Sequence, residues 1–99
     1  MAKRITRSGN IDQVDATILH TAVGDATLGG LSFNVPAGGT ITVSKYDQAT
    51  GVTSVLYAIA LEPGSGLSDS ESYSLLTGDY ISVLSSTPGS TFNTFIELP

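Results

Sequence analysis

Residues 40–61, TITVSKYDQATGVTSVLYAIAL, carry the strongest structural signal in this chain. Hydroxyl side chains at residues 40, 42 and 44 alternate with Ile41, Val43 and Lys45, which is the period of a half-buried β-strand. Residues 47–51 then form a short loop, in which Gly51 supplies the positive φ that such hairpins need. Because a second strand follows directly at residues 52–61, the stretch predicts an antiparallel β-hairpin.

The second strand of this hairpin is apolar on both faces. One face carries Val55, Tyr57, Ile59 and Leu61, and the other carries Leu56, Ala58 and Ala60. Apolar character on both faces indicates a central strand, or a strand whose outer face meets a partner.

Strands of the same kind are expected on both sides of the hairpin, and little helical periodicity is present. They are predicted at residues 16–23, 26–35, 67–76, 80–85 and 91–98, with a short extended piece at residues 11–14. The pair Gly29-Gly30 predicts a bulge or corner within its strand. Seven or eight strands with turn signals every eight to twelve residues predict an all-β fold, a single antiparallel β-sandwich that is Ig-like or jelly-roll-like.

The N-terminus differs in charge from the rest of the chain. Lys3, Arg4 and Arg7 are three of the four basic residues, whereas the whole chain has nine acids and a net charge of −5. We expect an extended basic N-terminal arm at residues 1–9 and the β-sandwich domain at residues 10–99. Because Lys and Arg pair well with acidic surfaces, we expect the arm to dock on a sister subunit rather than on its own sheet.

Composition excludes several classes of protein. The chain has no cysteine, so disulfides and thiolate metal sites are impossible. No apolar segment follows the N-terminal charges, and we therefore expect no signal peptide. The longest apolar run, residues 55–61, is far shorter than the ~20 residues that span a bilayer. An acidic body also argues against nucleic acid, so neither a membrane nor a nucleic acid is an expected partner.

No group of residues predicts catalysis. His20 is the single histidine, which leaves a catalytic triad or a His-based metal site without further members. Asp69, Glu71 and Asp79 could in principle contribute oxygens to Ca²⁺, but a solvated acidic face is the favoured interpretation. The glycines form no phosphate-binding motif. We expect no enzyme activity, no cofactor and no metal.

Two tyrosines are the aromatic candidates for surface contacts. Tyr46 lies at the tip of the predicted hairpin, and Tyr80 is out of phase with the inward residues Ile81 and Val83. Tyrosine combines a large contact area with a polar end, which suits an interface. The predicted interface residues are Lys3, Arg4, Arg7, Tyr46 and Tyr80.

Residues 73–86, YSLLTGDYISVLSS, resemble the L-x-x-GD-x-L-x-V-x-S/A-S segment of small structural proteins in tailed-phage virions. The order of residues 34–38, 40–43 and 55–61 extends the likeness over most of residues 14–98. A departure is the early position of the pair Pro63-Gly64, which an acidic, Ser-rich run follows. The resemblance implies a β-sandwich that decorates a capsid, or a collar, tail or fibre module, and it brings no catalytic residue.

These observations predict a non-enzymatic structural protein of a tailed-phage virion, specifically a capsid decoration or cement subunit. We expect it to form a homo-oligomer, to bind the major capsid protein or another virion protein, and to reside in the virion after assembly in the host cytoplasm. The alternatives are a collar, tail or fibre module, or a carbohydrate-binding or adhesin-type β-sandwich. A sugar-binding module would need exposed aromatic rings and normally an export signal, and the chain has no Trp.

Overall fold

The computed structural model describes residues 3–98, and the predicted hairpin is present in it. β4 (Gly39–Asp47) pairs antiparallel with β5 (Val52–Leu61). Gly51 has a φ of 71°, and its N–H donates to the carbonyl of Asp47 at 2.8 Å. The turn glycine therefore acts as predicted.

The described residues form nine strands, one more than the upper expected number. The other seven are β1 (Lys3–Asn10), β2 (Thr17–Thr21), β3 (Ala26–Val35), β6 (Ser65–Asp69), β7 (Tyr73–Leu75), β8 (Tyr80–Ser85) and β9 (Thr91–Leu98). The predicted strand at residues 67–76 is divided into β6 and β7, because residues 70–72 leave the ladder of β3. Residues 3–98 contain no helix, hence none long and apolar enough to cross a membrane.

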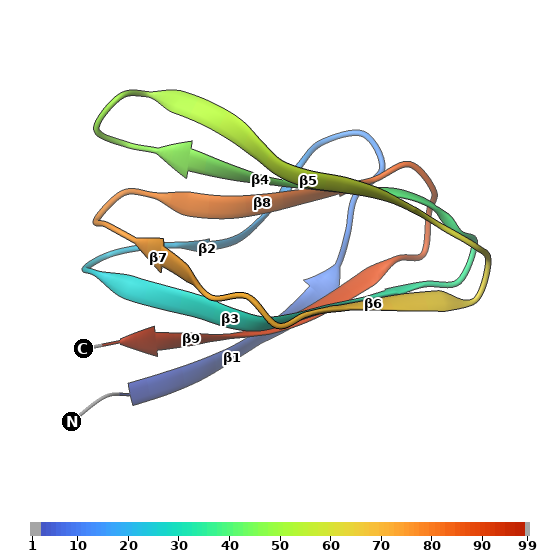
Figure 1. Ribbon diagram of the computed structural model, residues 1–99, viewed down its shortest axis with the longest axis horizontal. Helices are drawn as coiled ribbons and strands as arrows, with labels where there is room; N and C mark the ends of the chain where they lie inside the picture. The colour runs from blue at the N-terminus through green and yellow to red at the C-terminus, as the bar shows by residue number, and fades with distance from the viewer. Residues whose placement is uncertain (1–2, 99) are drawn as a thin grey trace.

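The strands form two antiparallel sheets packed face to face, which confirms the predicted β-sandwich (Figure 1). One sheet has the order β1-β9-β3-β6, with β7 also paired to β3, and the other has the order β2-β8-β4-β5. Along the chain most successive strands change sheet, so that connections cross between the layers. This is the arrangement of a jelly roll, and it selects one of the two sandwich types that the sequence left open.

The core lies between the inner faces of the two sheets. Leu28, Leu31, Ile41, Ile81 and Ile96 are each 0% exposed and come from both layers. Burial of one such side chain stabilises the fold by roughly 1.5–3 kcal/mol. Ile81 and Val83, the residues predicted to point inward from β8, are thus in the core.

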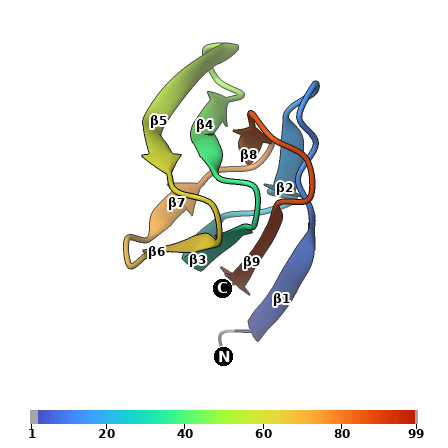
Figure 2. The same cartoon turned by 90° about the vertical axis from the view of Figure 1, so that its right-hand side faces the viewer.

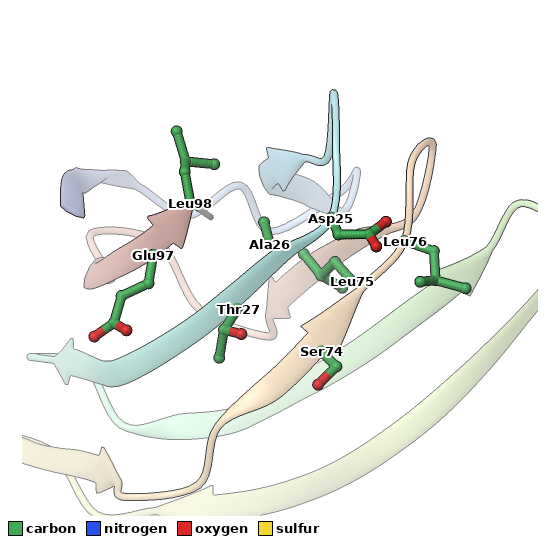
Figure 3. Close-up of a pocket in the computed structure, with 8 residues that line it drawn as sticks. All are labelled: Asp25, Ala26, Thr27, Ser74, Leu75, Leu76, Glu97 and Leu98. Atoms are coloured by element: carbon green, nitrogen blue, oxygen red, sulfur yellow. The ribbon is translucent and has the colours of Figure 1, made fainter. Parts of the chain in front are cut away.

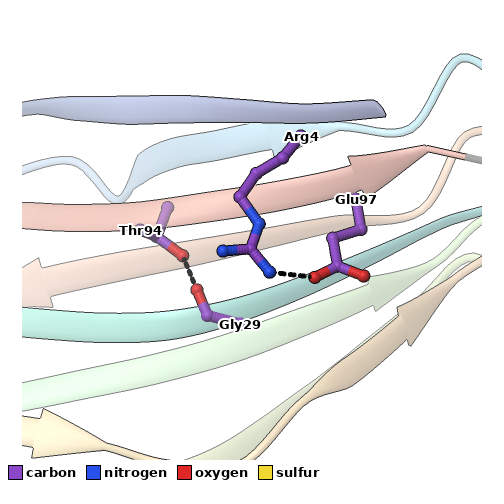
Figure 4. Close-up of polar contacts among 4 residues, drawn as sticks. All are labelled: Arg4, Gly29, Thr94 and Glu97. Atoms are coloured by element: carbon purple, nitrogen blue, oxygen red, sulfur yellow. Dashed lines mark hydrogen bonds and ion pairs between the residues drawn. The ribbon is translucent and has the colours of Figure 1, made fainter. Parts of the chain in front are cut away.

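The Gly29-Gly30 bulge is also confirmed. The pairing of β3 with β9 shifts register between Gly29 and Ser32, and Gly30 has a φ of 58°. The buried hydroxyl of Thr94 donates to the carbonyl of Gly29 at 2.7 Å (Figure 4). A β-carbon at Gly30 would lie 2.8 Å from the ring of Phe95, so the aromatic side chain requires glycine here.

The interpretation of β5 as a central strand is wrong, because β5 is the edge of its sheet. Its inward face is also only partly as predicted. Val43 pairs with Tyr57 and Ser44 pairs with Val55, so Leu56 has no partner in β4 and forms a β-bulge. The side chains that point inward therefore alternate differently before and after Leu56. Tyr57 packs against the core, whereas Val55, predicted on the same face, is 63% exposed.

The predicted N-terminal arm needs a correction as well. Residues 1 and 2 lie outside the described residues, but residues 3–9 are part of β1 and pair with β9 of the chain's own sheet. All eight residues of β1 pair with β9, and Ile5 adds an apolar contact opposite the fully buried Ile96. β1 continues to Asn10, so the predicted boundary between arm and sandwich does not coincide with a structural one.

Candidate assembly surface

The edges of the two sheets are the places where unpaired backbone groups could accept another strand. β1 and β2 lie on one side of the sandwich, and β5 with β6 and β7 on the other (Figure 2). The four edges differ in charge, length and regularity, and these differences decide which of them can accept a strand.

The β1 edge is basic. The guanidinium of Arg4 pairs with the carboxylate of Glu97 at 2.5 Å (Figure 4). It also lies 4.1 Å from the centre of the Phe95 ring. Lys3 and Arg7 are exposed and lie opposite Leu98 and Thr94, in the phase that points toward the sandwich interior. Cations on an edge strand, especially inward-pointing ones, discourage pairing with a like strand and remain attractive to an acidic partner.

The β6 and β7 edge is acidic and tied to β5. The carboxylate of Asp69 accepts hydrogen bonds from the hydroxyls of Tyr57 at 2.8 Å and Tyr73 at 2.6 Å. It also accepts the backbone N–H of Glu71 at 2.9 Å. Burial opposes ionisation of Asp69, but these three hydrogen bonds outweigh it and hold the pKa of the carboxyl below its usual range. Asp69 therefore joins the two sheets.

The β2 edge is short and irregular. Its five residues shift register against β8 between Ile18 and His20. Ile18 is 51% exposed on the outer face, whereas His20 lies opposite the buried Ile81. Among the described residues, the Nε2 atom of His20 is buried without a hydrogen-bond partner. Burial, with a smaller repulsion from Arg7, lowers the pKa of His20, so the side chain is a neutral core-edge residue.

The β5 edge is long and uncharged. Its ten residues, VTSVLYAIAL, contain no Asp, Glu, Lys, Arg or Pro. Val52, Val55 and Leu56 are 53%, 63% and 36% exposed, which places apolar side chains at the surface along this strand. Sequence reasoning noted its two apolar faces but not its edge position. The signal that could have indicated an edge contact was the absence of charge over ten residues.

Tyr46 and Tyr80 lie together on the outer face of the β2-β8-β4-β5 sheet. They are direct cross-strand partners in β4 and β8. Their rings stack with centroids 4.8 Å apart and an angle of 17° between the ring planes. The sequence predicted both as surface residues without placing them side by side. Lys3, Arg4 and Arg7 belong to the other sheet, so the five predicted interface residues form two separate groups.

The Gly78-Asp79 pair of the resemblance segment has a structural role. The buried carboxylate of Asp79 accepts the backbone N–H of Gln48 at 2.9 Å and that of Leu76 at 3.1 Å. These hydrogen bonds lower its pKa. The N–H of Ala22 donates to the carbonyl of Asp79, and the carbonyl of Ala22 accepts from the N–H of Gly78, both at 2.8 Å. The pair thus connects three loops at one end of the sandwich, and Asp79 is committed to this role.

One open hollow of about 470 Å³ lies at the end of the sandwich, between residues 25–27, 74–76 and 97–98 (Figure 3). Its titratable side chains are Asp25 and Glu97, and Glu97 is already paired with Arg4. Within residues 3–98, no three His, Cys, Asp or Glu side chains are grouped so that they could hold a metal ion.

A scan against protein-family models finds no match for this chain, and a comparison with curated protein sequences finds none either. Its structure is similar to solved β-sandwich proteins. One belongs to Bacillus endospore appendages, described as a family of disulfide-linked pili, with a TM-score of 0.61, 15% identity, and coverage of 98% of this chain and 85% of that chain.

Two further similar structures come from different settings. The T13 IBDV viral particle gives a TM-score of 0.58 at 14% identity, covering 97% of this chain and 30% of that one. The globular domain of zebrafish complement 1qA protein gives a TM-score of 0.55 at 10% identity, covering 98% of this chain and 94% of that one. At such low identity these similarities establish a shared fold.

Proposed function

We propose that this chain is a non-enzymatic structural subunit of a virion, specifically a capsid decoration or cement subunit of a tailed phage. The observation that carries the proposal is the separation of two contact groups on opposite sheets: the basic residues of β1 and the stacked pair Tyr46 and Tyr80. Two such groups let one small block touch two neighbours in a lattice. Weak single contacts then add through multivalency.

The proposed partners are other copies of the chain and the major capsid protein or another virion protein, within the particle. Lys3 and Arg7 would face an acidic neighbour, whereas Arg4 is already engaged by Glu97 and Phe95. The resemblance of residues 73–86 to tailed-phage virion proteins supports this setting. A collar, tail or fibre position would use the same surfaces.

The binding-module alternative has weaker support. Sugar sites in β-sandwiches stack the ligand on an open aromatic face, but Tyr46 and Tyr80 stack on each other. One face of each ring is therefore unavailable to a ligand.

Co-sedimentation tests this proposal. The purified chain is mixed separately with capsid shells and with tails of the tailed phage encoded in the same genome. We expect saturable binding to shells at a fixed number of copies per capsomer. Binding to tails alone would move the chain to a tail module, and binding to neither would overturn the virion proposal.

A matched pair of variants tests the contact groups. Replacing Lys3 and Arg7 by Ser removes two cations while Ile5 keeps β1 attached to β9. We expect this variant to bind shells more weakly, with a smaller dependence on salt. The control replaces Lys45, which instead bonds the carbonyl of Ser74 at 3.1 Å, by Ser.

A further inference from the structure

The free edge of β5 lacks the features that protect the other edges. β1 carries Lys3, Arg4 and Arg7, β6 ends at Asp69, and β2 is five residues long with a register shift. Charges, short length and irregular pairing are the usual protections of an exposed strand edge. β5 has ten residues and no charge.

The bulge at Leu56 limits which part of β5 can pair. Residues 57–61 continue beyond it as a regular run paired with residues 39–43 of β4. Ala58 and Ala60 are exposed, whereas Tyr57, Ile59 and Leu61 are half-buried. A run of five regular residues with small outer side chains leaves room for another strand to approach.

We infer that residues 57–61 of β5 pair antiparallel with the same residues of a second copy, across a two-fold axis at Ile59. The run YAIAL is nearly symmetric about its centre. Tyr57 would lie opposite Leu61 of the partner subunit, and Ala58 opposite Ala60 of the partner subunit. Apolar residues then face apolar ones and small residues face small ones. The two four-stranded sheets become one continuous sheet.

The chemistry of the edge indicates a second copy as the occupant. Unpaired backbone N–H and C=O groups are matched by another strand rather than by a lipid or a sugar. Two chains of charge −5 repel each other, and the repulsion is smallest where an uncharged surface meets an uncharged surface. Because the other three edges are protected, the edge that a second copy can offer is β5 itself. An isologous contact of this kind closes as a two-fold dimer.

This inference deepens the proposed function and rests on it in one respect, that the chain works in more than one copy. It also differs from a contact through β1 in its response to salt. Pairing through uncharged residues persists at high ionic strength, whereas contacts of Lys3 and Arg7 with an acidic neighbour weaken.

The test compares charge variants at two exposed positions by sedimentation velocity and light scattering. For the unmodified chain we expect a species of twice the 10.2 kDa chain mass at both low and high salt. Ala58→Lys with Ala60→Lys places Lys opposite Lys twice across the axis, and should lower the association constant by at least about tenfold. Ala58→Lys with Ala60→Glu places opposite charges across the axis and should restore association.

The matched control is Ala16→Lys with Ala49→Lys, two exposed alanines outside the strands. It should associate like the unmodified chain. Thermal unfolding of each variant checks folding, and the Lys/Glu variant checks that charge alone is not disruptive. A monomeric unmodified chain, or equal association of the Lys/Lys variant and the control, would overturn the inference. The mass in solution tests the pairing of the β5 edges, and binding to shells tests the proposed virion role. Either hypothesis can therefore fail while the other holds.

Discussion

The hydroxyl of Tyr57 in β5 donates a hydrogen bond of 2.8 Å to the carboxylate of Asp69 in β6, and this contact joins strands of opposite sheets. Tyr73 of β7 donates to the same oxygen at 2.6 Å. Burial, together with these hydrogen bonds, raises the pKa of both tyrosines, so the hydroxyls remain protonated donors. A polar contact between side chains therefore supplements the apolar core at the side of the sandwich where β5 is exposed.

Removal of the Tyr57 hydroxyl should weaken the fold. Tyr57→Phe keeps the ring in place but leaves Asp69 with one fewer donor, and we expect a loss of about 1 kcal/mol in the free energy of unfolding. Chemical denaturation measures the change. Tyr46→Phe, on the outer face, is the matched control and should change the stability by less. Equal losses in the two variants would show that the Asp69 contact contributes nothing specific.

Stability should fall on mild acidification because of His20. Its pKa is lowered in the folded state relative to the unfolded value near 6.5, so the unfolded chain binds more protons. The stability that neutral His20 contributes to the fold is present above pH 6.5 and is lost as the pH falls through the pKa of His20 in the folded state. The melting temperature should therefore drop between about pH 7.5 and 5.5. In His20→Leu this slope should disappear, and an unchanged slope would exclude His20 as its source.

Gly78 should tolerate no side chain. Its φ of 91° is strained for other residues, and an added β-carbon would lie 2.7 Å from the Gln48 side chain. We expect Gly78→Ala to cost more than about 1 kcal/mol. Gly24→Ala is the control, because nothing lies within 4 Å of a β-carbon there. It should stay within about 0.5 kcal/mol of the unmodified chain. Equal costs would contradict the proposed connection of three loops by the Gly78-Asp79 turn.

Deletion of residues 1–7 should destabilise the sandwich. The deletion removes most of β1, including Ile5, and uncovers the edge of β9. We expect a loss of at least about 1 kcal/mol in unfolding free energy. The double replacement of Lys3 and Arg7 by Ser keeps the strand and should leave the stability within about 0.5 kcal/mol. A truncated chain as stable as the complete one would favour a separate arm.

Two valines on neighbouring strands test the β5 bulge. Val43 is 0% exposed and Val55 is 63% exposed. Val43→Ala should cost on the order of 2 kcal/mol, whereas Val55→Ala should change stability by less than about 0.5 kcal/mol. Comparable losses at the two positions would place Val55 in the core and contradict the shift of phase at Leu56.

Features that depend on neighbouring residues could be read from the sequence. Period-two alternation placed β8 at residues 80–85 and β9 at residues 91–98, as the structure has them. Turn chemistry identified Gly51, and the pair Gly29-Gly30 marked the bulge. These signals are local, because side-chain alternation and positive φ belong to a few consecutive residues.

Features that depend on distant residues came from the tertiary structure. Lys3 lies opposite Leu98, and nothing near either residue in the sequence indicates that β1 pairs with β9. Asp69 and Tyr57 belong to different sheets, and the bulge at Leu56 reverses the faces of β5 only through its register with β4. The order of the strands decides which sheet edges are free. That order depends on how the two sheets pack around one core, which involves residues far apart in the sequence. The sequence thus shows that residues 52–61 carry no charge, and only the tertiary structure shows that this strand is a free edge beside β4.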